Sequence, residues 1–125
     1  MIIKNTFFEK ALWTRGWEIE NIPYPQSALA KDLMLLCVYT TKSQSPLSFK
    51  EVVASLRPFS EAGIRKQLKR CLEEGWVRIV DSPSDKRVRH IVAEPRLLEL
   101  FERYAEIAPK DDIPSYKQLD SMNLT

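Results

Sequence analysis

The chain has 125 residues, which is enough to bury one hydrophobic core but too few for two independent ones. Its hydrophobic fraction of 44% and its charged fraction of 29% are ordinary for a globular domain and exclude a disordered or fibrous chain. No apolar run approaches the roughly 20 residues that span a bilayer, and no basic region followed by an apolar block opens the chain, so we expect a cytoplasmic protein without a membrane partner.

Positive charge is concentrated in one part of the chain. The formal net charge is only +2, yet residues 57–90 hold nine Lys or Arg against five Asp or Glu. Such a basic stretch is typical of a surface that contacts phosphates. A solvated helix face that happens to be basic is the plain alternative, and charge alone does not separate the two.

The cysteine and histidine content speaks against metal and nucleophilic chemistry. Cys37 and Cys71 are each flanked by apolar residues at helical spacing, which predicts two buried thiols. The single histidine, His90, has no Cys or His at ligand spacing, so we expect no metal site and no cofactor. A dyad of Cys37 and His90 would require a chance meeting in space, so an enzyme has little support.

Residues 1–26 are rich in aromatic side chains, and we assign them to an N-terminal arm. Phe8 and Leu12 have helical spacing, whereas the apolar residues after Gly16 follow a more extended pattern. The two prolines at positions 23 and 25 disfavour helix at the residues before them. We therefore expect a short helix that stops near Gly16.

Two helices are expected between residues 27 and 56. Apolar residues at helical spacing after Ser27 cover a wide arc, which predicts a central helix. The sequence SFKE at 48–51 is a capping box, in which the Ser48 hydroxyl accepts from the Glu51 amide and the Glu51 carboxylate reaches back. It predicts a short second helix over 49–56 that buries Phe49, Val52, Val53 and Leu56.

A third helix is predicted over 61–74. Pro58 disfavours helix at the residue before it, and Ser60 is a good cap for a new start. Gly75 fits the position just beyond the helix end, where a left-handed conformation is common. The sequence RPFS at 57–60 therefore serves as the tight turn between two helices.

Strand and helix signals fill the rest of the chain. WVRIV at 76–80 and VRHIVA at 88–93 predict two strands, and the turn-rich DSPSD between them predicts a β-hairpin with a charged tip. Pro95 suits the first turn of a last helix with an apolar stripe, which Pro109 ends. The remaining tail to residue 125 has little periodicity.

This order of elements is that of a winged helix-turn-helix, so the expected fold is mainly α (α+β) with a two-stranded β-hairpin wing. On the third helix, Ile64, Leu68, Cys71 and Leu72 lie on one side at about 100° per residue, and Ala62, Lys66, Lys69 and Arg70 lie on the other. A basic outward face on the helix that such motifs place in the major groove favours double-stranded DNA as the partner. We assign residues 27–94 to the DNA-binding core and residues 95–125 to a C-terminal helix and tail.

Residues 46–104 resemble the winged-helix core of the MarR family of bacterial transcriptional regulators. The most specific parts are LEEGWV, where the third helix ends, and DKR in the wing, which matches the Asp-any-Arg motif of that family at Asp85 and Arg87. The resemblance implies a symmetric homodimer on pseudo-palindromic DNA, with recognition helices in the major groove and wings over the minor groove. It also implies that Arg87 enters the minor groove and that Asp85 helps to hold it.

The other wing residues have less specific expected roles. A narrow minor groove concentrates negative potential, so an arginine on a hairpin tip is stabilised there. Lys86 and Arg89 are expected to meet phosphates or to solvate the tip. His90 is expected to be a half-exposed strand residue rather than a switch.

The start of the recognition helix departs from the pattern of that family. Where small hydroxyl residues are common, this chain has Glu61, Ala62 and Gly63. Glu61 suits a helix start but repels phosphate, and Gly63 offers no side chain to read a base. We therefore expect Arg65 and Lys66 to read the bases, and Ser60, Lys69 and Arg70 to lie towards the DNA backbone. Ala62, on the outward face, completes the set of DNA-binding residues expected on this helix.

The arm and the last helix are the expected dimerisation segments, as the resemblance implies. An aromatic arm is too apolar to leave exposed, so it packs either on its own core or across a twofold axis. The second option is favoured, with an interface that includes Phe7, Phe8, Trp13, Trp17, Leu98 and Phe101. No residue identifies a small-molecule effector.

Two functions of different kinds remain. The leading one is a dimeric transcriptional regulator that binds double-stranded DNA. The other is a winged helix that serves as a protein–protein interaction module, whose basic residues face an acidic partner and whose Gly63 reflects lost base readout.

Overall fold

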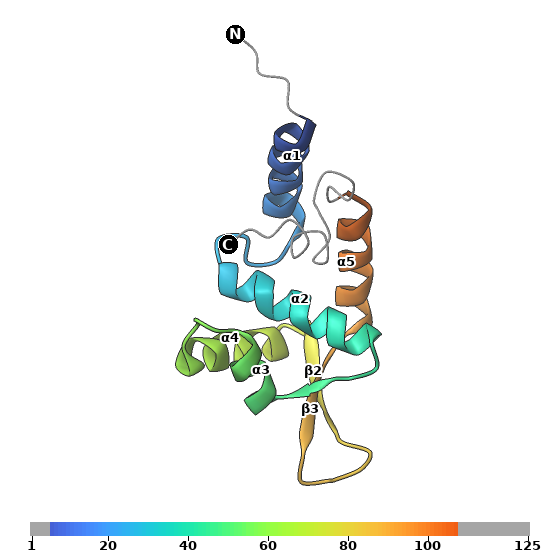
Figure 1. The fold of residues 1–125 in the computed structure, drawn as a ribbon. Helices are drawn as coiled ribbons and strands as arrows, with labels where there is room; N and C mark the ends of the chain where they lie inside the picture. The colour runs from blue at the N-terminus through green and yellow to red at the C-terminus, as the bar shows by residue number, and fades with distance from the viewer. Residues whose placement is uncertain (1–5, 108–125) are drawn as a thin grey trace, which may run out of the picture.

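The computed structural model describes residues 6–107 of the chain. Within this range the elements are α1 (Thr6–Asn21), α2 (Ala28–Lys42), β1 (Leu47–Ser48), α3 (Phe49–Ser55), α4 (Glu61–Glu73), β2 (Val77–Asp81), β3 (Arg89–Ala93) and α5 (Pro95–Ile107) (Figure 1). No helix in this range has the length and apolar character of a membrane span. The predicted helix end at Pro109 and the tail after it lie outside the described residues.

Helix α2 is the centre of the core, as its wide apolar arc predicted. It begins after Ser27, whose hydroxyl accepts a hydrogen bond of 3.0 Å from the Ala30 amide. Leu33 and Met34 are fully buried, and α2 contacts β3, α4 and α5. Cys37 and Cys71 are both buried free thiols, as expected, and burial raises the pKa of Cys37 to about 12.

The helix-turn-helix is formed by α3 and α4. Both hydrogen bonds of the capping box are present: the Glu51 amide donates to the Ser48 hydroxyl at 3.3 Å, and the Ser48 amide donates to the Glu51 carboxylate at 3.0 Å. Val52 and Leu56 are buried, whereas Phe49 and Val53 are only partly buried against the core. The capping signal therefore sets the start of α3 correctly, and α3 ends one residue before the predicted position.

A glycine ends α4, and an arginine of α5 binds the carbonyl groups at this end. Gly75 has a φ of 75°, the left-handed conformation predicted for it. Arg96 lies over the Trp76 ring, with its Cζ 3.7 Å from the ring centroid. Its guanidinium donates to the carbonyl oxygens of Gly75, at 3.1 Å, and of Glu74. These bonds satisfy carbonyls that the helix end leaves free.

Gly75→Ala is expected to lower the free energy of unfolding by about 1–2 kcal/mol, because a side chain is disfavoured at a positive φ. Gly16→Ala is the matched control with the opposite sign. Gly16 lies inside α1 with open space around it, so alanine there should raise the free energy of unfolding by up to about 1 kcal/mol. Urea denaturation measures both, and two shifts of the same sign would contradict this account.

The sheet has three strands rather than the predicted two. β2 and β3 pair antiparallel, with Val77 opposite Ala93 and Asp81 opposite Arg89, which is the expected wing hairpin. The expectation missed β1, whose Leu47 lies opposite Ile91 in the antiparallel order β1-β3-β2. Two residues are too few to show an alternating pattern, so only the pairing with β3 reveals this strand.

The expectation that the first helix stops near Gly16 is wrong. Helix α1 continues to Asn21, because its second half packs on α5. The Trp17 ring lies 5.7 Å from the Tyr104 ring, centroid to centroid, and Ile22 just beyond the helix is buried. These contacts outweigh the roughly 1 kcal/mol by which glycine disfavours a helix interior.

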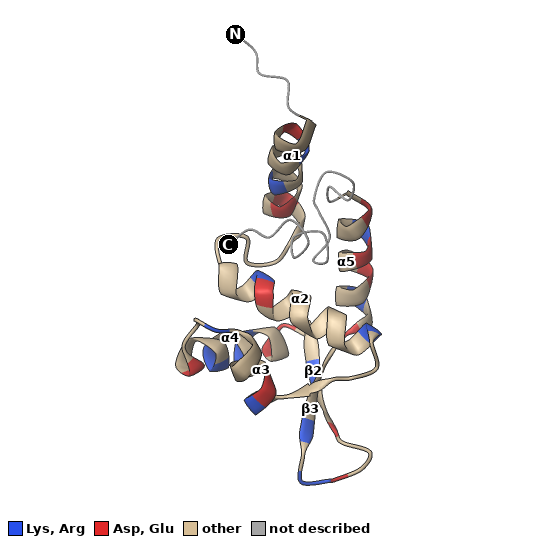
Figure 2. Cartoon of the chain, viewed as in Figure 1, with Lys and Arg blue, Asp and Glu red and all other residues tan. Residues whose placement is uncertain are grey.

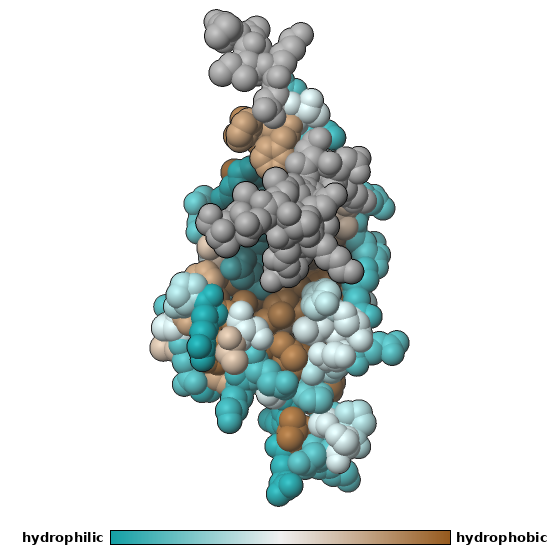
Figure 3. Space-filling view, in the orientation of Figure 1, coloured by the Kyte–Doolittle hydropathy of each residue, from teal (hydrophilic) through white to brown (hydrophobic). Residues whose placement is uncertain are grey.

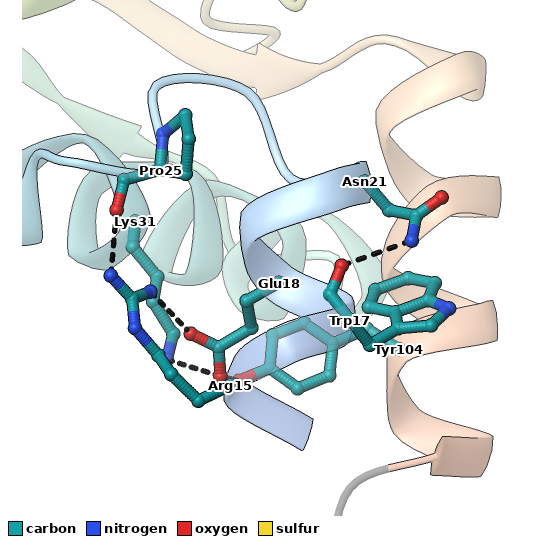
Figure 4. Close-up of polar contacts among 7 residues, drawn as sticks. All are labelled: Arg15, Trp17, Glu18, Asn21, Pro25, Lys31 and Tyr104. Carbon is teal, nitrogen blue, oxygen red and sulfur yellow. Dashed lines mark hydrogen bonds and ion pairs between the residues drawn. The ribbon is translucent and has the colours of Figure 1, made fainter. Parts of the chain in front are cut away.

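A buried carboxylate joins α1, α2 and α5 (Figure 4). The Glu18 side chain is only 8% exposed, and it lies 2.9 Å from the Lys31 ammonium and 3.1 Å from the Arg15 guanidinium. Tyr104 of α5 donates its hydroxyl to the same carboxylate. Burial alone raises the pKa of Glu18, but the hydrogen bonds from Tyr104, Lys31 and Arg15 outweigh it and bring this pKa below its ordinary value.

Candidate nucleic-acid interface

Basic side chains gather on two parts of the molecule, helix α4 and the hairpin between β2 and β3. Figure 2 shows Lys and Arg along α4, on β3 and at the hairpin tip. The two parts are joined through β2, which contacts α4 and follows it directly in the chain. Helix α4 and the hairpin are therefore presented together by one core.

Helix α4 has the two faces that its sequence predicted. Ser60 caps its start, with its hydroxyl accepting from the Gly63 amide at 3.1 Å. Ile64, Leu68 and Cys71 are buried, and Leu72 is partly buried. The exposed positions include all five residues of α4 that we expected to face DNA: Ala62, Arg65, Lys66, Lys69 and Arg70.

Gly63 has a packing role that the sequence did not indicate. It is partly buried, and a Cβ added to it would lie 3.1 Å from the Ser60 hydroxyl and 3.5 Å from a methyl group of Leu29 on α2. The tight distance is to the Ser60 hydroxyl that caps α4, whereas 3.5 Å to Leu29 is an ordinary van der Waals contact. The lack of a side chain at this position therefore has a local reason at the helix cap, and it gives no support to a loss of base readout.

Most of the positive charge on α4 is paired within the helix and its cap. Arg65 lies 3.8 Å from Glu61, Lys69 lies 4.0 Å from Glu73, and Arg70 lies 3.3 Å from Glu74. All three pairs are exposed, so each contributes only a few tenths of a kcal/mol and can be exchanged for a phosphate. Lys66 has no acidic partner among the described residues.

Two arginines of α4 lie over aromatic rings of other elements. The Arg65 Cζ is 4.4 Å from the Phe49 ring centroid at the start of α3, and the Arg70 Cζ is 4.2 Å from the Tyr24 ring centroid in the α1–α2 connection. These contacts direct the two guanidinium groups to opposite sides of α4. Arg70 therefore faces the α1–α2 connection, and Arg65 faces the side of the sheet.

The wing tip holds the Asp85–Arg87 pair. Asp85 accepts three hydrogen bonds from Arg87: two from the guanidinium, at 3.2 and 3.3 Å, and one from the backbone amide, at 3.0 Å. The Arg87 side chain is 90% exposed. The same hydrogen bonds lower the pKa of Asp85, and they hold the guanidinium in one orientation.

The other wing residues are also at the surface. Lys86 and Arg89 are exposed, and the Arg89 guanidinium lies 4.0 Å from Asp81 across the hairpin. His90 is partly buried, in keeping with its expected place on a strand. Among residues 6–107, no group of three or more His, Cys, Asp or Glu is arranged to hold a metal ion.

The six residues predicted for a dimer interface have different surroundings. Phe8 and Trp13 are 61% and 59% exposed, and Figure 3 shows hydrophobic side chains on this part of α1. Trp17 packs on Tyr104 of its own chain, and Phe101 is buried in its own core. The remaining two, Phe7 and Leu98, are partly buried.

Solved structures of transcriptional regulators resemble this chain over nearly its whole length. The MepR–DNA complex of S. aureus covers 95% of this chain and 83% of its own, with a TM-score of 0.64 at 11% identity. S. aureus MepR bound to ethidium bromide covers 97% and 90%, with a TM-score of 0.66 at 10% identity. Tm0710 from Thermotoga maritima covers 93% and 80%, with a TM-score of 0.56 at 14% identity. The chain has the fold of MarR-like regulators.

No family model and no curated protein matches the sequence. At the low identities of the solved structures, the likeness is one of fold. It confirms the winged helix-turn-helix that the order of elements predicted, with α3 and α4 as the helix-turn-helix and the β2–β3 hairpin as the wing.

Four residues contribute to the basic and apolar surfaces of this MarR-like fold, although the sequence did not predict that they would. Phe49 and Tyr24 lie under Arg65 and Arg70, and no local pattern marks them, because each comes from a different element. Leu12 and Ile19 are 75% and 49% exposed on α1. Once α1 runs through Gly16, Phe8, Leu12 and Ile19 fall within about 40° on one helical face.

Proposed function

We propose that this protein is a transcriptional regulator that binds double-stranded DNA, with α4 in the major groove and the β2–β3 hairpin at the minor groove. The observation that carries the proposal is the Arg87 guanidinium, which projects from the wing tip and is held by Asp85. A solved structure of the same fold is a MepR–DNA complex, which supports the binding of DNA.

The recognition helix supplies the contacts to the major groove. Arg65 and Lys66 lie on the exposed face of its first two turns, where base edges come within reach. Lys69 follows one turn later and is suited to a phosphate, and Ser60 marks the helix start, where amide groups and the helix dipole favour an anion. Ala62 offers a methyl group to a thymine.

The wing supplies the contact to the minor groove. An arginine gains most where the groove is narrow, because the negative potential is concentrated there. Asp85 fixes the Arg87 guanidinium before binding, so less conformational entropy is lost on insertion. Lys86 and Arg89 flank this arginine at positions suited to the phosphates of the two strands.

The apolar face of α1 is proposed to pair with that of a second copy. Phe8, Leu12 and Ile19 are all exposed on one face of this helix, and Trp13 is exposed on the flank of this face, about 100° around the helix from Leu12. A twofold through this face would present two recognition helices to a pseudo-palindromic site. Phe101 and Trp17, which pack within their own chain, would stabilise α1 against its own core rather than contact the second copy.

A protein–protein interaction module is the second candidate function. The observation that favours it is an apolar groove of about 320 Å³ between α4 and the sheet, whose lining includes the basic residues Arg65, Lys69 and Arg89. An acidic protein surface could meet the same side chains. Binding to duplex DNA separates the two functions.

Fluorescence anisotropy of a labelled, sequence-randomised duplex tests the proposal. Binding is expected to weaken steeply with salt, with log K falling by about 0.9 per phosphate contacted for each unit of log salt concentration. Lys42→Ala is the control, because Lys42 ends α2, pairs with Glu102 of α5 and belongs to neither α4 nor the hairpin. Absence of binding at low salt would contradict the DNA-binding function and leave the interaction module.

Trp13→Ala is expected to shift the protein from dimer towards monomer, because it removes an exposed aromatic side chain from the proposed α1 interface. Sedimentation velocity over a range of concentrations measures the shift. Tyr39→Ala is the matched control, since Tyr39 is an exposed aromatic residue of α2. An unchanged sedimentation coefficient at low concentration would contradict the α1 interface.

A further inference from the structure

The side chain of Arg65 lies between a ring and a carboxylate. Its Cζ is 4.4 Å from the Phe49 ring centroid, within the range of a cation–π contact. The nearest acidic atom is a Glu61 oxygen at 3.8 Å, which is beyond ordinary hydrogen-bond distance. The Arg65 side chain is still 66% exposed. Its N–H donors are therefore supported from one side and free to bind on the other.

Phe49 is a rigid support, because its backbone is fixed on both sides. It is the first residue of α3, directly after β1, and the capping box of Ser48 and Glu51 sets the helix start at this point. Its ring packs against the core. The Phe49 ring therefore cannot follow Arg65 if the guanidinium swings away.

The surface around this contact is an apolar groove with a basic rim. The groove has a volume of about 320 Å³ and lies between α4 and the sheet. Its floor is formed by Phe49, Leu68, Leu72, Ile79 and Ile91, and its rim by Arg65, Lys69 and Arg89. An apolar floor offers Arg65 no competing acceptor, so the ring contact and the helix backbone decide where the guanidinium points.

We propose that Arg65 reads a guanine in the major groove and that Phe49 is its positioning residue. This inference rests on the proposed DNA-binding function and names the base that it selects. An arginine can donate two hydrogen bonds at once to O6 and N7 of guanine, and no other base offers that pair of acceptors. The loose contact to Glu61 is released when the base is bound.

The other basic residues of α4 lack this support. Arg70 is held on the far side of the helix by Tyr24 and by its 3.3 Å pair with Glu74. Lys66 is exposed and has three rotatable donors rather than a planar fork, so it is suited to a phosphate or to a single acceptor. The geometry therefore assigns base selection to Arg65.

The test uses a duplex selected for tight binding to the full chain, in which each guanine in turn is replaced by 7-deazaguanine. This analogue keeps base pairing but lacks the N7 acceptor. For one guanine, the wild type is expected to lose about 5-fold or more in affinity. Arg65→Ala, which removes the donors, should abolish this sensitivity, and Phe49→Leu should reduce it to about 2-fold or less. Phe49→Tyr, which keeps an aromatic face, should restore it.

The ratio of affinities for guanine and 7-deazaguanine duplexes distinguishes this positioning role from a merely structural one. Val53→Ala is the control, since Val53 is a partly buried residue of α3 that packs on the same core. It should lower stability without changing the 7-deazaguanine ratio. A Phe49→Leu variant with the wild-type ratio would overturn the positioning role, and a wild type insensitive at every guanine would overturn the guanine contact. A wild type that binds no duplex would overturn this inference and the proposed function together.

Discussion

Arg87→Ala is expected to weaken binding to sites with an A/T-rich minor groove by about 1–3 kcal/mol, and to weaken binding to G/C-rich flanks much less. The reason is the place of this guanidinium: it is 90% exposed at the wing tip and held by two hydrogen bonds to the Asp85 carboxylate. Competition binding with two duplexes that share one recognition-helix site and differ in their flanks measures the difference.

Two further variants distinguish a minor-groove contact of Arg87 from a contact to phosphate. Lys86→Ala should weaken binding about equally on both duplexes and should reduce the salt slope by about one, as expected for a phosphate contact. Asp85→Asn removes the charge that orients Arg87 and should show a smaller loss of the same A/T-dependent kind. An equal loss on both duplexes for Arg87→Ala would show that this residue contacts only phosphate.

Glu18→Gln is expected to lower the free energy of unfolding by about 2 kcal/mol at neutral pH. Removing the charge leaves Lys31 and Tyr104 without their shared ionised partner at the junction of α1, α2 and α5. This loss in the free energy of unfolding is smaller than for a fully buried ion pair, because the Lys31 and Arg15 side chains are 33% and 48% exposed. Urea denaturation measures it, with Glu20→Gln on the exposed face of α1 as the control.

The difference in the free energy of unfolding between wild type and Glu18→Gln should depend on pH. The folded-state pKa of Glu18 lies below its ordinary value of 4.5, so its ionised form stabilises the fold at pH values above 4.5. This stabilisation is lost as the pH falls through the folded-state pKa. The gap in stability between wild type and Glu18→Gln should therefore shrink below pH 4.5. A gap that stays constant down to acid denaturation would contradict the ionised cluster.

The sequence by itself determined the elements that depend on neighbours within a few residues. Ser27, Ser48 and Ser60 cap three helices by accepting hydrogen bonds from the amides three residues on. Gly75 ends α4 in the left-handed conformation that a glycine adopts without strain. The alternating strands around DSPSD gave the wing, and the Asp85–Arg87 contact spans only two residues. The helix-turn-helix order and both basic surfaces followed from these local signals.

The tertiary structure decided what depends on residues far apart in the chain. Helix α1 passes Gly16 because Trp17 and Glu18 contact Tyr104, more than 80 residues later. β1 exists only because β3 pairs with it. The Arg65 guanidinium is oriented by the ring of Phe49, which belongs to the preceding helix. Capping and turn energies act within a few residues, whereas these contacts form only when the core brings separate elements together, so no local pattern in the sequence could specify them.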